Sequence, residues 1–370
     1  MKRVLVFGMT ENPGGIESFL MSYCRRMDPA KLRFDFLCNC AEPVAYEQEL
    51  RAMGARIYRV PARSRDYFGY RRAMHAFFAQ HAAEYAAIWV NVCSLANIDY
   101  LLLAEKYGIP RRIIHSHNSQ NMDSRLRGLL HRRNRRRIGR CATDFWACSP
   151  AAAAWFYPPA LLPQAVTIRN AIDVERVRFD PAARQRLRQQ YGFGSRPVVG
   201  HVGRLHFQKN QRFLLEVFAG VRQRCPEAVL VLIGQGEDEE KLRQKAAELQ
   251  IADAVLFAGV QSHVPAWLSA FDLFLFPSLF EGLSIAALEA QGSGLPVLAS
   301  EGVIPPEVRL NDNFRFYPLA AGASAWAEEA CAMLRETGRV PFPAVRAAFA
   351  AAGFDIAVEA AKLEDRLMSE

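Results

Sequence analysis

Two glutamates in one short segment have the spacing that says most about chemistry in this chain. Glu281 and Glu289 are eight residues apart in FPSLFEGLSIAALEAQGSGLPVLAS (276–300), where a glycine-containing loop leads into a short apolar helix. Eight helical residues span roughly 12 Å. That is wider than the roughly 5–10 Å between two carboxylates that flank one glycosidic bond. The spacing favours two contacts to one long ligand over an acid and its nucleophile.

The helix between these carboxylates predicts an anion site. The first amides of a helix have no intrahelical partner, and the positive end of the helix dipole attracts phosphate. A carboxylate, a group of amides and a second carboxylate would suit a sugar, a diphosphate and a ribose in a row.

Three other segments carry residues that suit a phosphate. In GHVGRLHFQKNQ (200–211), Arg204 and Lys209 stand around a helix start and suit a diphosphate, although a solvated surface pair is the alternative. The glycines of LIGQGEDEEKL (232–242), Gly234 among them, fit either close ligand approach or an ordinary turn. The same choice applies to Gly14 and Gly15 in TENPGGIESFL. That segment is not G-x-G-x-x-G, so a dinucleotide site is poorly supported.

His115 and His117 in RRIIHSHNSQ (111–120) end a predicted strand and point to one face. Zinc ligation would need further ligands at suitable spacing, and none stands nearby in the sequence. Packing at the strand end is an alternative. The pattern favours an active-site position, and we expect no metal site.

The segment RLRGLLHRRNRRRIGR (125–140) holds eight arginines and no acid, and it contributes much of the net charge of +8. Basic amphipathic segments of this kind bind membrane surfaces or nucleic acid, and a solvated helix face is the alternative. No nucleic-acid motif accompanies it, so we expect no nucleic-acid partner. We expect contact with an anionic membrane surface through Arg132, Arg133, Arg135, Arg136 and Arg137.

The whole chain positions these residues on two α/β domains. Its 370 residues suffice for two domains, and short β-rich runs alternate with amphipathic stretches throughout, which is typical of parallel sheets covered by helices. Ligands bind such sheets at the carboxyl ends of the strands. The expected strands are 3–7, 34–38, 88–92, 112–115, 145–148, 166–168, 198–202, 229–233, 255–257, 273–276, 297–299 and 314–317. The expected divisions are an N-terminal domain (1–175), a polar linker (176–196), a C-terminal domain (197–350) and a final segment (351–370).

The bulk composition indicates a cytoplasmic protein. Eight cysteines show no zinc spacing, and several stand in strand-like runs, which favours reduced thiols over disulfides. No run approaches the roughly 18 apolar residues of a transmembrane helix, and the N-terminus does not resemble a signal peptide. We therefore expect a cytoplasmic location, with peripheral attachment to the inner face of the plasma membrane through the basic segment.

The segments GGIESFL, RIIHSHNS, FWACSPAAAAW, NAID, GRLHFQKN, LIGQGE and above all 276–300 resemble, in this order, the retaining GT-B glycosyltransferases of family 4. The capsular and exopolysaccharide branch is the most similar. The resemblance implies two Rossmann-like domains that face each other across a cleft. The N-terminal domain would bind the acceptor and the C-terminal domain the nucleotide sugar. A final helix, 357–367, would cross back to the N-terminal domain.

The resemblance also implies roles for single residues. Arg204 and Lys209 would hold the donor diphosphate, Glu289 the ribose and Glu281 the sugar hydroxyls. The sugar and phosphate cradle would be completed by backbone amides, at Gly282, Leu283, Ser284, Ile285 and Ala286. Many relatives have proline in place of Ser284, glycine in place of Ala171 and a catalytic histidine in place of Asn91. This last difference makes His117, beside Asn91, the substitute candidate.

We therefore expect a retaining hexosyltransferase that uses a UDP- or GDP-sugar, without metal or other cofactor, and acts on a glycan or lipid-linked acceptor in surface polysaccharide biosynthesis. The alternatives are a sugar-nucleotide epimerase of the same fold and a non-catalytic protein that binds sugars or lipid headgroups. An epimerase would convert the donor with no acceptor present. A binding protein would bind without turnover.

Overall fold

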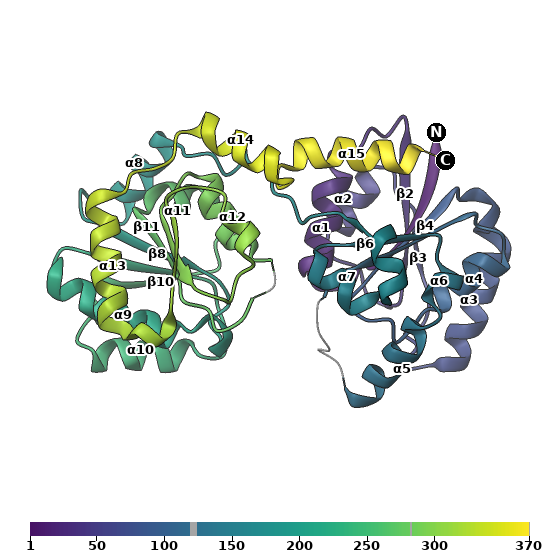
Figure 1. Ribbon diagram of the computed structural model, residues 1–370, viewed down its shortest axis with the longest axis horizontal. Coiled ribbons are helices and arrows are strands. Elements are labelled where there is room, and N and C mark those ends of the chain that lie inside the picture. Colours follow the sequence, from purple (N-terminus) through teal and green to yellow (C-terminus); the bar gives the residue numbers. More distant parts are fainter. Residues whose placement is uncertain (119–123, 282, 370) are drawn as a thin grey trace. The chain divides into compact units, whose positions relative to one another are not determined.

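The computed structural model describes residues 1–118, 124–281 and 283–369, which form two compact units (Figure 1). The first unit is Met1–Ala171 together with Ile356–Glu370, and the second is Ile172–Asp355. Gly282, one of the expected cradle positions, lies outside the described residues.

The first unit contains a parallel sheet of seven strands in the order β3-β2-β1-β4-β5-β6-β7. The strands are β1 (Lys2–Phe7), β2 (Leu32–Cys38), β3 (Ile57–Arg59), β4 (Ala87–Val92), β5 (Arg111–Ser116), β6 (Asp144–Ala147) and β7 (Val166–Thr167). The helices are α1 (Gly15–Cys24), α2 (Glu47–Ala52), α3 (Tyr67–His81), α4 (Asp99–Lys106), α5 (Arg125–Arg135), α6 (Ile138–Cys141), α7 (Pro150–Phe156) and α15 (Ile356–Met368).

Helices cover both faces of this sheet. Successive strand residues point to opposite faces, so Leu5 of β1 packs in one apolar core while Val4 and Val6 pack in the other. The first core includes residues of α3, α4, α6 and α7, and the second includes residues of α1 and α15. The strands are apolar on both faces, as expected of a doubly covered parallel sheet.

The second unit repeats this architecture with six parallel strands in the order β10-β9-β8-β11-β12-β13. The strands are β8 (Val198–Val202), β9 (Val229–Ile233), β10 (Val255–Gly259), β11 (Leu273–Phe276), β12 (Val297–Ser300) and β13 (Phe314–Tyr317). The helices are α8 (Pro181–Gln190), α9 (Gln211–Arg224), α10 (Glu239–Glu248), α11 (Val264–Ala270), α12 (Ile285–Gly292), α13 (Gly322–Glu336) and α14 (Phe342–Ala352). One core includes residues of α11, α12 and α14, and the other includes residues of α9, α10 and α13.

The α/β architecture expected from the alternation is confirmed, and every expected strand is present within about two residues of its expected ends. The structure adds β3, which pairs with β2. It has three residues, too few for a two-residue alternation to be recognised in the sequence.

The polar passage 176–196, expected to be a linker, is part of the second unit. It contains α8, whose Arg184 and Arg188 donate to the carboxylate of Asp272 just before β11. Arg188 also donates to the carbonyl oxygens of Ala270, Gly194 and Arg196. These arginines attach the segment 176–196 to the second unit. The polar, arginine-rich composition of the segment had instead suggested a solvent-exposed linker.

The last helix, α15, belongs to the first unit (Figure 1). Its apolar residues Ile356, Ala360, Leu363 and Leu367 pack in the core that contains α1. The carboxylate of Glu364 accepts hydrogen bonds from the Asp28 amide and the Lys31 ammonium, both at 2.7 Å. None of the helices described is both long and apolar enough to span a bilayer.

Candidate active site

The loops that carry the expected donor-binding residues leave one edge of the second sheet. Strands β9, β8 and β11 are neighbours and run parallel, so their carboxyl ends lie at the same edge. The loop after β8 carries Arg204 and Lys209, and the loop after β11 carries Glu281 and leads into α12. This is where ligands bind to doubly wound sheets.

Lys209 and Glu281 form an ion pair between these two loops. The Lys209 Nζ lies 2.6 Å from Glu281 Oε1, and the side chains are only 18% and 6% exposed. The same ammonium lies 5.1 Å from the centroid of the Phe276 ring, at the end of β11. Shielding from water strengthens such a pair and fixes the position of its charges. The structure therefore brings together two residues that stand 72 positions apart in the chain.

Arg204 differs from Lys209 because its side chain is 69% exposed. Its Nη2 lies 3.0 Å from Oε2 of Glu237, in the loop after β9, and the His206 ring lies 3.3 Å from the other oxygen of that carboxylate. The pKa of Glu237 is lowered by a hydrogen bond from its own backbone amide and by the charge of Arg204. The guanidinium is accessible to a ligand while Glu237 limits where it can lie.

Two buried side chains fix the backbone from which Arg204 extends. The Nδ1 of His201, in β8, lies 2.9 Å from the carbonyl oxygen of Leu275 in β11. Burial lowers the pKa of His201 to about 4, so the ring is neutral near pH 7. With Nδ1 donating to Leu275, Nε2 accepts from the Gln211 amide at 3.3 Å, and that amide also donates to the Arg204 carbonyl oxygen at 2.8 Å. Sequence reasoning missed both residues, although a histidine inside the apolar run VVGHV was a signal for His201.

Gly234 permits close contact between the loops after β8 and β9. Its φ is +132°, and a Cβ atom at this position would lie 2.1 Å from the carbonyl oxygen of Gly203. A side chain would therefore separate the two loops. Of the two alternatives for Gly234, tight packing of these loops accounts for the glycine without a ligand.

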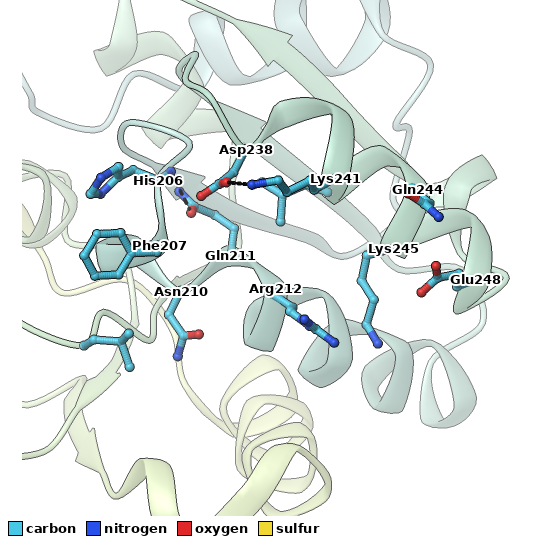
Figure 2. A pocket seen from close by; sticks show the side chains of 12 residues that line it. His206, Phe207, Asn210, Gln211, Arg212, Asp238, Lys241, Gln244, Lys245 and Glu248 are labelled. Atoms are coloured by element: carbon cyan, nitrogen blue, oxygen red, sulfur yellow. Dashed lines mark hydrogen bonds and ion pairs between the residues drawn. The ribbon is translucent and has the colours of Figure 1, made fainter.

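The loop that carries Arg204 and Lys209 also borders a cavity of about 460 Å³ (Figure 2). His206, Phe207 and Asn210 line it together with residues of the α10 region, where Lys241 pairs with Asp238 at 3.1 Å. Neither glutamate of the 276–300 segment lines this cavity, and neither does Arg204 or Lys209. It is separate from the candidate donor site.

The N-terminus of α12 follows the loop that carries Glu281. Ser284 is its N-cap and accepts a hydrogen bond from the Ala287 amide at 3.4 Å. Ile285 is 37% exposed, while Leu283 and Ala286 are partly buried against the apolar core. The Ser284 hydroxyl therefore accepts a hydrogen bond from one of the first amides of the helix. The start of α12 lies at the sheet edge from which the loops with Arg204, Lys209 and Glu281 leave.

Glu289 lies in the second turn of α12 and is largely buried. Burial raises the pKa of its carboxyl group to about 7, although the charge of Arg176 acts in the opposite direction. The carboxylate accepts no hydrogen bond from any residue that the structure describes. The helix lies close to the 172–177 segment, since a Cβ on Gly292 would lie 2.5 Å from Val177. A partly buried carboxylate without a protein donor can accept hydrogen bonds from hydroxyl groups of a ligand.

In the first unit, Asn91 and His117 are in contact at the ends of neighbouring strands. Asn91 is buried in β4, and its Oδ1 lies 2.9 Å from Nε2 of His117, just after β5. Burial lowers the pKa of His117 to about 3, so the imidazole is neutral near pH 7. Because Nε2 donates to the amide oxygen, Nδ1 is an acceptor, and it has no partner among the residues described. The pair can orient a hydroxyl group but cannot supply an imidazolium proton.

His115 packs beside this pair, with its ring centroid 4.2 Å from that of His117. In the described part of the chain, no three His, Cys, Asp or Glu side chains are grouped as a metal site. The rings of Phe19 and Trp89 also pack on His115. His115 thus has the packing role that was one of its alternatives.

Gly14 and Gly15 begin α1 and differ in their surroundings. The Gly14 amide donates to the buried carboxylate of Glu17 at 3.1 Å. The amide and hydroxyl of Thr10 donate to the other carboxylate oxygen, at 3.1 and 2.6 Å. Glu17 thus holds the turn, a role not recognised in the sequence. A Cβ on Gly15 would meet no atom within 4 Å, so the space there is open.

The basic segment forms α5, and one face of this helix is exposed. Arg132, Arg133, Arg136 and Arg137 are exposed, and so are Leu126 and Leu129, at 69% and 60%. The other face is held by Asn134, whose amide donates to the Leu95 carbonyl oxygen at 2.7 Å.

Arg135 does not belong to the exposed set, although it was one of the expected membrane contacts. Its Nη2 donates to the carbonyl oxygens of Ala154 and Tyr157, at 2.9 and 2.6 Å. The residue sits on the side of α5 that packs against α7, where its charge stabilises the end of that helix. Composition could not distinguish it from its neighbours.

Comparison with known proteins decides the family. A model described as "Glycosyl transferase 4-like domain" matches residues 14–171, and one described as "Glycosyl transferases group 1" matches residues 196–336. The putative glycosyltransferase EpsF of Bacillus subtilis (strain 168) is 31% identical over 312 residues, which cover 82% of this chain and 80% of EpsF. The chain belongs to the group 1 glycosyltransferases.

The sequence motifs predicted a glycosyltransferase of group 1, and these matches confirm both the family and the glycosyltransferase activity. A GDP-mannose-dependent phosphatidylinositol monomannoside mannosyltransferase of Mycobacterium tuberculosis is also similar, at 35% identity over 170 residues, which cover 44% of this chain and 41% of the relative. Among solved structures, Anabaena Alr3699/HepE in complex with UDP and glucose has a TM-score of 0.75 at 20% identity, with both chains covered completely. The fold is GT-B, as expected.

Arg204 is exposed and Lys209 is largely buried, so we expect their removal to affect stability differently. Lys209→Met leaves the Glu281 carboxylate buried without its partner and should lower the free energy of unfolding by roughly 1–3 kcal/mol. Arg204→Met should change it by less than about 0.5 kcal/mol, because exposed ion pairs contribute little. Both should weaken the binding of nucleoside diphosphates. Urea unfolding and calorimetric titration measure the two effects.

The control is the double variant Lys209→Met/Glu281→Gln, in which the buried charge is removed with its partner. It should recover most of the stability but not the nucleotide affinity. Equal destabilisation by Arg204→Met and Lys209→Met would contradict the assignment of a buried pair.

The raised pKa of Glu289 predicts a pH-dependent stability. The pKa is 4.5 in a model compound and about 7 in the folded chain, so burial of the carboxyl group costs nothing below pH 4.5 and costs most above pH 7. Glu289→Gln should therefore raise the free energy of unfolding at pH 8, by up to about 3 kcal/mol, and have little effect near pH 4.5. Unfolding curves at both pH values test this, with exposed Glu240→Gln as the control. A gain that is the same at both pH values would show that the charge of Glu289 is not the cause.

Proposed function

We propose that this chain is a retaining hexosyltransferase that takes its donor from a nucleotide diphosphate sugar. The observation that carries the proposal is the Lys209–Glu281 pair, with Arg204 on the same loop as Lys209 and the N-terminus of α12 after Glu281. Two cations and free helix amides at one sheet edge suit a diphosphate. Carboxylates on either side of them suit the hydroxyl groups of a sugar and a ribose.

The base of the donor is uridine or guanosine, and relatives support both. HepE was solved in complexes with UDP and with UDP-glucose, and the mycobacterial relative is described as GDP-mannose-dependent. The acceptor is a hydroxyl group of a glycan or a lipid-linked sugar, bound by the first unit. The name of the mycobacterial relative gives a phosphatidylinositol monomannoside as its acceptor, which supports a role in building surface polysaccharides or glycolipids.

In the proposed reaction, the bond between the sugar C1 and the diphosphate oxygen breaks while the acceptor oxygen forms a bond to C1 on the same face. The acceptor hydroxyl gives its proton to an oxygen of the departing diphosphate. Arg204, Lys209 and the amides at the start of α12 stabilise the negative charge that grows on that diphosphate. Removal of one such electrostatic contact typically costs about 2.7–4 kcal/mol in the barrier.

The remaining site residues bind and orient in this proposal. Glu281 accepts hydrogen bonds from hydroxyl groups of the transferred sugar while it keeps Lys209 in place. Glu289 accepts from the ribose. Asn91 and neutral His117 orient the acceptor hydroxyl by hydrogen bonding. None of these residues forms a covalent bond to the sugar, and the two side-chain cations supply the charge that a divalent metal would otherwise provide.

Site variants and product analysis test the transfer. Arg204→Ala, Lys209→Ala and Glu289→Ala should each lower kcat/KM for transfer by about 10²–10³, while Arg186→Ala, an exposed arginine of α8, should leave it unchanged. A panel of UDP- and GDP-sugars identifies the donor, and NMR of the product determines the anomer. EDTA should have no effect.

Other results would identify the alternatives. Conversion of the donor sugar with no acceptor present would indicate an epimerase, and tight calorimetric binding without turnover would indicate a binding protein. A product with inverted configuration would contradict the retaining mechanism, and loss of activity in EDTA that Mg²⁺ restores would contradict metal independence.

We also propose that the exposed face of α5 attaches the enzyme to the cytoplasmic face of an anionic membrane. Arg132 and Arg133 of α5 are exposed, as are Arg136 and Arg137 just after it and the apolar Leu126 and Leu129. Basic amphipathic helices of this composition bind anionic lipids.

Replacing Arg132, Arg133, Arg136 and Arg137 with Gln should strongly reduce cosedimentation with anionic vesicles and leave the fold intact. Each lost charge should cost about 1 kcal/mol near the surface. Arg135→Gln should instead destabilise the fold, because Arg135 bonds to α7. Vesicles of neutral lipid are the control. Vesicle binding that persists in the fourfold variant would disprove the proposed contact.

A further inference from the structure

A cavity in the first unit has a volume of about 1,080 Å³. It opens at the carboxyl ends of β1, β2, β3 and β4, and Asn91 forms part of its wall. Thr10 and Asn12, from the turn held by Glu17, form another part. A cavity at this edge of a parallel sheet, beside a residue expected to orient the acceptor, is where an acceptor would bind.

The charged residues that line this cavity are mostly arginines. They are Arg59 at the end of β3, Arg63 and Arg65 in the loop before α3, Arg127 on α5, and one acid, Glu11. These arginines come from two separate parts of the chain, the end of β3 with the loop after it and helix α5. Guanidinium groups that converge from different segments suit an anion with several oxygens, because each can form two parallel hydrogen bonds.

Ion pairs within the chain neutralise Arg59, Arg63 and Arg65 only in part. Arg59 pairs with Glu47, but that carboxylate also pairs with Arg51, so two cations share one acid. Arg63 lies 3.6 Å from Asp99, which is long for an ion pair. Arg65 is exposed and forms no ion pair with any residue in the described ranges. Positive charge therefore remains available in the cavity.

The neutral part of the lining suits a sugar. Asn39 and Asn97 both donate to the Tyr100 hydroxyl, at 2.8 and 3.2 Å. The Asn39 Oδ1 is buried and accepts no hydrogen bond from a described residue. A buried acceptor without a partner is costly unless a ligand or water donates to it. The polar side chains of Asn12, Ser64 and Ser94 also line the cavity and suit the hydroxyl groups of a sugar.

We propose that this cavity binds an acceptor whose sugar is linked to a phosphate or diphosphate group. The arginines contact the phosphate oxygens, and Asn39 and its neighbours contact the sugar. This inference rests on the proposed function, because it identifies the chemical class of the acceptor. The same chemistry occurs in free sugar phosphates and in lipid-linked sugar diphosphates, and the experiment separates these two sources.

The test measures binding of inorganic pyrophosphate by calorimetry to the full chain carrying Arg204→Gln and Lys209→Gln, which removes the competing diphosphate site. In that background, Arg63→Gln and Arg65→Gln should each weaken binding about tenfold or more, and together they should abolish it. Arg72→Gln is the matched control, because Arg72 is exposed on α3 and does not line the cavity. Thermal unfolding of each variant verifies that the fold is retained.

Two further arms complete the test. Farnesyl diphosphate that binds at least tenfold more tightly than pyrophosphate would indicate a lipid-linked acceptor, whereas equal affinity would indicate a free sugar phosphate. In otherwise wild-type enzyme, Arg63→Gln/Arg65→Gln should leave donor hydrolysis unchanged, because these residues lie outside the donor site.

The proposal is overturned if pyrophosphate does not bind, or if it binds equally to the Arg63→Gln/Arg65→Gln variant and to the Arg72→Gln variant. Neither result depends on transfer activity. Failure of the acceptor assignment is therefore distinguishable from failure of the proposed function, which would show instead as absence of donor turnover.

Discussion

The ion pair between Lys209 and Glu281 is the contact on which the candidate donor site depends. It connects the loops that follow β8 and β11, and its partners are nearly shielded from water. A buried charge pair is expensive to form unless its geometry is held by the surrounding structure. Here the neutral ring of His201 connects the same two strands, and Gln211 connects that ring to the backbone of Arg204. The site is thus positioned before any ligand arrives.

The donor site combines fixed groups with groups that respond to the ligand. Arg204 is exposed, and its partner Glu237 is exposed as well, so the guanidinium can exchange a carboxylate for a phosphate at little cost. Glu289 is partly buried and accepts no hydrogen bond from a described residue, and burial raises its pKa to about 7. A ribose hydroxyl would supply the missing hydrogen bond and favour the ionised form. Binding of a nucleotide would therefore lower the pKa of this carboxyl group.

The sequence was sufficient to predict the fold and the loops that carry the site, because apolar strands, glycine turns and helix starts are local patterns. It could not predict partners that are distant along the chain. Glu237, for example, pairs with Arg204 across two loops, although the two residues are 33 positions apart. Arg135 had the same composition around it as its neighbours, yet it bonds to α7. Such contacts depend on which helix face is turned inward and which strands become neighbours.

The division of the chain also has a consequence for biosynthesis. The second unit is continuous, whereas the first is completed only by α15, from the far end of the sequence. During translation the first 171 residues emerge early but lack the helix that covers part of their core, including Tyr23 and Phe19 of α1. Because domains otherwise fold as they leave the ribosome, the core of the first domain stays partly uncovered until α15 has been synthesised. The order of maturation is therefore the reverse of the order of synthesis.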